Sequence, residues 1–154
     1  MSATVNGAGA MSADELATAS AEGMRAGDSA LAFFGISVDA VKPGRAAVSM
    51  TVRAEMTNGH AICHGGVIFT LADTAFAYAC NSYNQRAVAF HCAVTFMRPG
   101  KLGERLVAEA VERHREGRSG IYDVVVRNGE GEAIAEFRGH SRTIGGQYVA
   151  DAKG

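Results

Sequence analysis

The stretch that decides the fold is Gly65-Gly66 followed by VIFTLADTAFAYACNS over residues 67–82. This run is apolar nearly all round, and its only charged residue is Asp73. A helix that is apolar on every side is usually buried inside a protein rather than lying on its surface. The sequence therefore predicts one long buried helix that begins at the glycines and ends near Asn81.

Shorter elements precede this helix. Ser12 and Glu15 have the spacing of a capping box, which predicts a helix of small residues that continues to about Arg25. A short helical turn is expected next, capped by Asp28 and stopped by Gly35. The other elements before residue 65 are expected to be two strands, 36–41 and 45–53, joined by a turn at 42–44.

After the long helix, the chain alternates between apolar and polar residues, as half-buried strands do. Four strands are expected, over 88–96, 106–114 and around 122–126 and 133–138, with turn signals at Glu116-Gly117 and Asn128-Gly129. On the first of them, one face would carry Val88, Phe90, Cys92, Val94 and Phe96. This order predicts an α+β fold in which one antiparallel, six-stranded sheet wraps around one long buried helix.

Composition limits the possible functions. The chain has 154 residues, with 15 basic and 16 acidic side chains, so it suits one domain and offers no basic surface to a nucleic acid. No uncharged apolar run is long enough to span a membrane, and the three cysteines favour free thiols in the cytoplasm. We expect a single domain over 12–146, between an N-terminal tail, 1–11, and a C-terminal tail, 147–154.

Two features of the buried helix can carry chemistry. Glycines at a helix start let a ligand approach unpaired backbone N–H groups, which carry the positive end of the helix dipole and can stabilise an oxyanion. Asp73 is a lone carboxylate among apolar residues, and burying it without a partner would cost several kcal/mol, on the order of other isolated buried charges. Such a carboxylate is either used in a reaction or fully hydrogen-bonded.

Other interpretations of these residues stay open. Asp73 can be a structural hydrogen-bond acceptor, and Gly65-Gly66 a tight turn. His60, Cys63 and His64 lie close together, but no fourth residue has the spacing of a metal ligand, so no metal is expected. Cys63 could instead be a nucleophile. Basic residues near a hairpin form either a solvated face or a phosphate-binding patch: Arg113, Arg115 and Arg118.

Short motifs surround the helix: Asn58-Gly59-His60, Cys63-His64-Gly65-Gly66, Leu71–Ala77, Phe96–Gly100, Tyr122-Asp123-Val124 and Phe137-Arg138-Gly139. Together they resemble the motifs of the hotdog-fold acyl-CoA thioesterases, most closely the phenylacetate-degradation (PaaI) type, and the resemblance covers roughly residues 28–146. The resemblance implies hydrolysis of acyl-CoA, either phenylacetyl-CoA or its hydroxylated derivatives, to a free acid and coenzyme A. It implies no cofactor, because coenzyme A is part of the substrate.

The resemblance also implies roles for individual residues. Asp73 would be the catalytic carboxylate, acting as a general base on water or as a nucleophile. Gly65 would supply the backbone N–H that polarises the thioester carbonyl, and His64 and Asn58 would orient the carbonyl or the water. The positions that match coenzyme A contacts are Arg98, Arg118 and Ser119.

Helix geometry predicts that two chains share each site. Gly66 and Asp73 are separated by about 10 Å along a helix axis, whereas a catalytic group must come within about 3 Å of the reacting atoms. A two-fold axis would bring the helix start of one chain to Asp73 of the other. We therefore expect a homodimer with shared sites, and the resemblance implies that two dimers pair into a homotetramer.

Two alternative functions remain at this point. A hotdog hydratase or dehydratase would pair a catalytic histidine with an acid, but His91 and His140 lie outside any such pattern. A non-catalytic acyl-CoA-binding module is possible because a fold does not by itself imply catalysis. The presence of Asp73 favours an enzyme.

Overall fold

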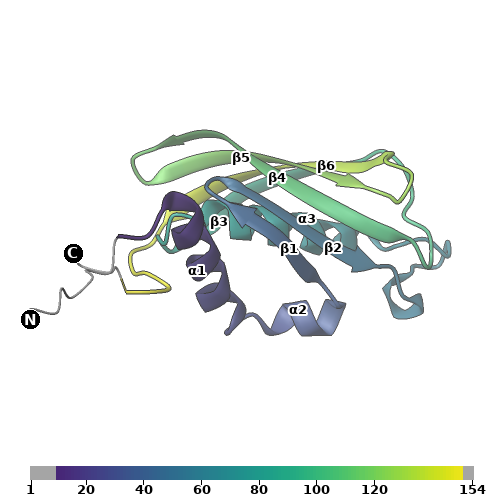
Figure 1. Ribbon diagram of the computed structural model, residues 1–154. Coiled ribbons are helices and arrows are strands. Elements are labelled where there is room, and N and C mark those ends of the chain that lie inside the picture. Colours follow the sequence, from purple (N-terminus) through teal and green to yellow (C-terminus); the bar gives the residue numbers. More distant parts are fainter. Residues whose placement is uncertain (1–9, 151–154) are drawn as a thin grey trace, which may run out of the picture.

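The structure, a computed structural model, describes residues 10–150. One antiparallel sheet contains six strands in the order β1-β2-β4-β5-β6-β3. In Figure 1 this sheet arches over α3, and the predicted α+β hotdog architecture is confirmed. The elements are α1 (Ala13–Arg25), α2 (Ser29–Phe34), β1 (Ser37–Lys42), β2 (Arg45–Thr51), the 3-10 helix η1 (Ala54–Met56), α3 (Gly65–Cys80), β3 (Ala87–Phe96), β4 (Arg105–Glu116), β5 (Ser119–Arg127) and β6 (Ala133–Thr143).

The core lies between α3 and the inner face of the sheet. Phe76 of α3 makes an edge-on ring contact with Tyr122, with ring centroids 5.6 Å apart, and a tilted one with Phe137, at 5.9 Å. Gly139 of β6 lies so close to Phe76 that a Cβ at this position would meet the ring at 2.7 Å. A glycine is therefore required at this point, where β6 packs against the Phe76 ring.

The N-terminal helices largely follow the sequence prediction. Ser12 and Glu15 form the reciprocal capping box of α1. Gly35 ends α2 with φ +65°, the left-handed conformation that glycine adopts without steric cost. Asp28 lies at the predicted N-cap of α2, but its side chain makes no capping bond. Its carboxylate instead accepts a hydrogen bond from the hydroxyl of the buried Tyr78 at 3.4 Å, which links the start of α2 to α3.

The strand β3 differs from its prediction because of a β-bulge after Ala89. A bulge adds one residue, so the apolar residues before and after it point to opposite faces of the sheet. Cys92 packs against the core, whereas Phe90 packs edge-on against His140 on the outer face. The prediction that Val88 and Phe90 share a face with Cys92 is therefore wrong.

The two predicted hairpin turns differ in shape. Glu116-Gly117 lies at a tight connection in which Gly117 has a positive φ of 56°. The Asn128-Gly129 signal lies in a longer loop, in which the Asn128 carboxamide oxygen accepts from the N–H groups of Glu130 and Glu132. The positive φ in this loop belongs to Gly131, at 81°. The Asn128 side chain, rather than a two-residue turn, therefore organises this end of the sheet.

The outer edge of β3 is unpaired within residues 10–150. The opposite edge of the sheet, β1, packs against α1. Large apolar side chains along and just after β3 are exposed: Val88 by 46%, Phe90 by 53%, Phe96 by 49% and Met97 by 42%. A long, apolar edge strand of this kind can pair with a strand of another chain.

The last described residues are bound to the end of α3. The buried Asn84 donates to the Val149 carbonyl at 2.8 Å and accepts from the N–H groups of Tyr148 and Val149. The Tyr148 hydroxyl donates to Asn81, the C-cap residue of α3. Residues 147–149 of the tail predicted at 147–154 are thus held by specific hydrogen bonds. Among the described residues, no helix combines the length and apolarity needed to cross a membrane.

Candidate active site

A short irregular hairpin leads the chain into α3. The Asn58 N–H donates to the Ile62 carbonyl at 2.9 Å, and Ala61 adopts a positive φ of 59° at the turn. The Asn58 carboxamide oxygen accepts from the His60 N–H at 2.9 Å, so this oxygen holds the hairpin. Asn58 also lines the cavity described below, and its side-chain NH₂ group is the part left to contact a ligand.

A second loop, from the Arg98-Pro99-Gly100 motif, holds this hairpin in place. The Cys63 N–H donates to the Gly100 carbonyl at 2.8 Å. A Cβ on Gly100 would meet the Cys63 Cβ at 3.2 Å, so the two backbones lie unusually close. The sequence motif therefore has a structural reason: a glycine lets the loop after β3 support the start of α3.

The start of α3 presents one open backbone donor. His64 is the N-cap residue, and its Nδ1 accepts a hydrogen bond from the Gly66 N–H at 3.2 Å. The Gly65 N–H has no hydrogen-bond partner among residues 10–150. It lies beside an open cavity of about 430 Å³. Polar groups that line this cavity are Asn58, Gly65 and Arg98, and apolar ones include Ile62, Ile68, Phe96 and Met97.

Phe96 is a cavity residue whose role the sequence did not predict. Its ring lies over Gly65, where an added Cβ would meet the ring at 3.0 Å. Any larger residue at position 65 would therefore require the half-exposed Phe96 ring to shift. Strand alternation placed Phe96 on the inner face, but alternation carries no information on which residue of a distant helix it meets.

Asp73 lies two turns farther along α3 and does not line the cavity. Its carboxylate makes no hydrogen bond with any described residue, and burial raises its pKa above the ordinary value of 3.8. Its charge in turn helps to raise the pKa of Cys92, after the larger effect of burial, so the carboxylate lies near β3. The Asp73 charge thus acts on Cys92 of β3 and on Cys80 of α3, and Asp73 is not among the residues that line the cavity with Gly65.

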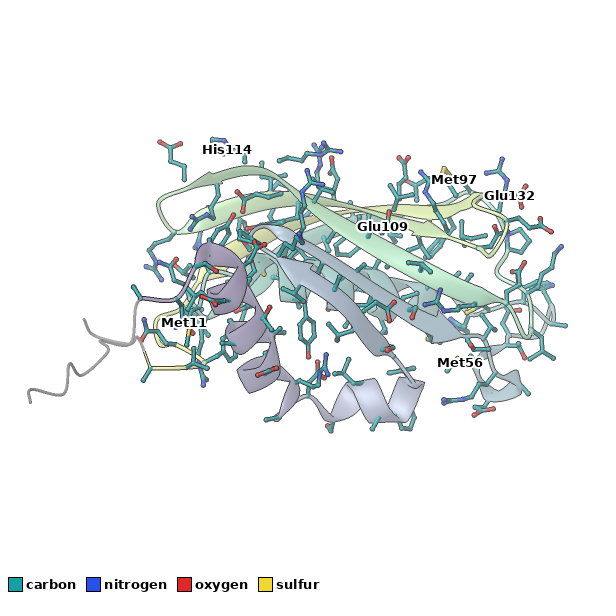
Figure 2. The ribbon with its side chains drawn as sticks, viewed as in Figure 1. Met11, Met56, Met97, Glu109, His114 and Glu132 are labelled. Atoms are coloured by element: carbon teal, nitrogen blue, oxygen red, sulfur yellow. The ribbon has the colours of Figure 1, made fainter. Side chains whose placement is uncertain are left out.

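The three positions predicted to bind coenzyme A are divided between two ends of the molecule. Arg98 lines the cavity, donates to the Ala133 carbonyl at 3.0 Å and remains half exposed. Arg118 and Ser119 lie at the β4–β5 hairpin, where both Nε and Nη2 of Arg118 donate to the Thr143 carbonyl. In Figure 2, Met97 and Glu132 mark the cavity end of the sheet, and His114 marks the opposite, hairpin end. One chain therefore does not bring the three residues together.

The alternative chemistries find little support in the geometry. Burial raises the pKa of Cys63 to about 11, so this thiol is protonated at neutral pH and is a poor nucleophile. No three His, Cys, Asp or Glu side chains of residues 10–150 cluster as metal ligands would. The arginines near the hairpin are engaged: Arg113 pairs with Asp123 at 2.9 Å, and Arg115 stacks over the Tyr83 ring at 3.7 Å.

Comparisons with known proteins identify the family of the chain. The family model of the thioesterase superfamily matches residues 60–135. The chain is 46% identical over 132 residues to the acyl-coenzyme A thioesterase PaaI of Escherichia coli K12, covering 86% of this chain and 94% of the relative. The solved structure of E. coli PaaI, from the phenylacetic acid degradation operon, matches with a TM-score of 0.87 at 45% identity, over 88% and 99% of the two chains.

A second solved relative is a mutant of the phenylacetic acid degradation protein PaaI from Thermus thermophilus. It matches with a TM-score of 0.73 at 37% identity, over 76% of this chain and all of the other. The chain belongs to the thioesterase superfamily and, within it, to the PaaI-type acyl-coenzyme A thioesterases.

Proposed function

We propose that the protein hydrolyses aromatic acyl-CoA thioesters, phenylacetyl-CoA or its ring-hydroxylated derivatives, to the free acid and coenzyme A. The observation that carries the proposal is the open Gly65 N–H at the start of α3, beside a largely apolar cavity. The names of the E. coli and T. thermophilus relatives support the acyl class. Hydrolysis transfers no electrons, and no cofactor is part of the proposal. The protein would work in the cytoplasm, where its three free thiols stay reduced.

In the proposed reaction, the Gly65 N–H donates to the thioester carbonyl oxygen and stabilises the oxyanion that forms there. One such donor contributes about 3–4 kcal/mol to transition-state stabilisation in other acyl-transfer enzymes. Asp73 acts either as a general base that takes a proton from water or as a nucleophile on the carbonyl carbon. In the first route the water oxygen attacks the carbonyl carbon, whereas in the second Asp73 forms a mixed anhydride that water then hydrolyses to the free acid and restored Asp73. In both routes the C–S bond breaks, and coenzyme A leaves as a thiol after its sulfur takes up a proton that ultimately comes from the water. Burial supports this role, because it raises the pKa of Asp73 and so makes its carboxylate a stronger base.

The proposal includes a homodimer in which each site takes Gly65 from one chain and Asp73 from its partner. Three observations support it: Asp73 lies outside the cavity that contains Gly65, its carboxylate lies near β3, and the edge of β3 is unpaired. Antiparallel pairing of β3 with its copy would also bring the hairpin end of one chain, with Arg118 and Ser119, toward the cavity end of the other. Pairing of two such dimers into a homotetramer remains a prediction.

A panel of acyl-CoA thioesters tests the proposed activity. Purified protein is incubated with phenylacetyl-, hydroxyphenylacetyl-, acetyl- and medium-chain acyl-CoA, and released thiol is measured with a thiol reagent. We expect the highest kcat/KM for the aromatic substrates. Binding without thiol release would support a non-catalytic acyl-CoA-binding module instead. A hydratase is disfavoured because His91 and His140 contact each other on the outer face and do not line the cavity.

Replacing Arg98 with alanine should raise KM for acyl-CoA by about fivefold, the scale of one exposed charge pair, and leave kcat nearly unchanged. The reason is that a guanidinium at the cavity rim would hold a phosphate far from the reacting carbonyl. The effect should weaken as salt concentration rises. Arg127→Ala is the matched control, because Arg127 likewise donates to a loop carbonyl, that of Gly131, outside the cavity. A loss of kcat at constant KM in Arg98→Ala would contradict this role.

A further inference from the structure

The structure shows which backbone N–H groups at the start of α3 have a hydrogen-bond partner. An α-helix leaves its first four N–H groups without intrahelical partners. Here the His64 N–H donates to the Met56 carbonyl at 2.8 Å, the Gly66 N–H to the His64 Nδ1 at 3.2 Å, and the Val67 N–H to the His64 carbonyl at 2.9 Å. Each of these three bonds involves His64. The fourth donor, the Gly65 N–H, is the one left open among the described residues.

A cap is needed because the turn is weak by composition. Glycine is the poorest helix former apart from proline, and α3 begins with two glycines. N-cap positions are usually filled by Ser, Thr, Asp or Asn, whose side-chain oxygen accepts a backbone N–H. The His64 ring does the same with a nitrogen, from an extended backbone with φ −62° and ψ 135°. The side chain is exposed, so burial does not hold the ring in this position.

The electrostatics of the turn leave room for one negative charge. The first turn of α3 contains no acidic residue that would neutralise the helix dipole. Because Nδ1 accepts a hydrogen bond, it carries no proton, and the ring N–H lies on Nε2. The ring therefore accepts the Gly66 N–H without adding a charge at the helix start. An oxyanion that arrives at the turn meets one open donor, the Gly65 N–H.

We infer that His64 is a positioning residue. By capping the Gly66 N–H, its Nδ1 fixes the first turn of α3 so that the Gly65 N–H alone faces the thioester carbonyl. This differs from the expectation that His64 orients the carbonyl or the water directly, which would require a contact through Nε2. The inference rests on the proposed function, in which the Gly65 N–H polarises the carbonyl.

Four substitutions at His64 separate the capping role of Nδ1 from a direct substrate contact through Nε2, because their side chains differ in length. His64→Ser and His64→Asn keep an acceptor near the place of Nδ1, whereas His64→Gln keeps a donor near the place of Nε2 and His64→Ala keeps neither. Capping variants should retain kcat within about threefold of wild type, because Ser and Asn are good N-caps. The Gln and Ala variants should lose kcat by about tenfold or more at nearly constant KM, because misplacing one oxyanion donor acts mainly on the transition state.

The measurements are kcat and KM for phenylacetyl-CoA, taken well below each variant's melting temperature, together with that melting temperature. Activity that survives in His64→Gln but not in His64→Asn and His64→Ser would overturn the inference in favour of a direct contact. Equal kcat in all variants would overturn it as well, since the cap would then affect stability alone. If His64→Ala does not fold, the comparison of Gln with Asn gives the same answer. A wild type that hydrolyses no acyl-CoA would refute the proposed function, and the positioning role with it.

Discussion

Replacing Asp73 with asparagine should lower kcat for acyl-CoA hydrolysis by at least about a hundredfold, the usual scale for losing a general base. Asparagine keeps the shape of the side chain and removes only the basic or nucleophilic oxygen. Steady-state release of thiol from phenylacetyl-CoA measures the effect. Asp39→Asn serves as the control, because it removes an exposed carboxylate of β1, paired with Arg105, that takes no part in the proposed site. Wild-type rates in folded Asp73→Asn would refute the assignment.

The stability of the same variant separates a catalytic Asp73 from a structural one. Burial raises the pKa of Asp73, so the folded protein binds this proton more tightly than the unfolded chain does. Its ionisation therefore costs stability once the pH rises from the unfolded value, near 3.8, through the raised folded value. Above that window Asp73→Asn should melt at a higher temperature than wild type, and below it the difference should vanish. A lower melting temperature at neutral pH would indicate a structural hydrogen-bond acceptor.

Mixing two inactive chains should restore activity if each site is shared. Asn58→Ala and Asp73→Asn chains carry different tags, are produced together, and the mixed dimer is purified through both tags. One of its sites then holds both defects, and the other combines an intact Asn58 with an intact Asp73. We expect about half of wild-type activity, because a two-fold dimer contains two equivalent sites.

The reciprocal mixture is the matched control. A chain that carries both Asn58→Ala and Asp73→Asn is paired with a wild-type chain. With shared sites, each site receives one defect and the mixed dimer is inactive. If both residues serve the same site from one chain, this dimer instead retains half of the activity. The dimer of Asn58→Ala with Asp73→Asn chains is then inactive. The two mixtures have the same substitutions in total, so a general loss of stability cannot imitate the pattern.

The long helix and the six strands could be predicted from the sequence because their signals are local. The apolar run around Asp73 is too uniform for a surface helix, and the alternation at Tyr122, Val124 and Val126 matches the buried face of β5. For β3, the sequence did not predict on which face of the sheet Val88 and Phe90 lie, because it did not predict the bulge. One extra residue reverses the side on which every earlier residue lies, and nothing in the alternation around Phe90 records it.

The residues of the candidate site could be predicted from the sequence, whereas their positions relative to one another could not. The separation of Gly65 from Asp73 follows from helix geometry, and the structure adds that Gly65 lines the cavity whereas Asp73 does not. The support that Gly100 gives to Cys63 depends on backbone atoms of distant segments, which have no residue-type signal. The position of Arg118 at the far hairpin follows from strand pairing, which one sequence does not specify.

The unpaired edge of β3 has a consequence for how the rate should scale with enzyme concentration. In the proposed dimer, a dissociated chain holds two halves of different catalytic centres and no complete one. Dilution then removes centres rather than slowing each of them, so mass action governs the specific activity. Far below the dissociation constant, the rate should fall with the square of chain concentration. Substrate bound across the two chains should oppose this loss, because it binds the assembled form alone.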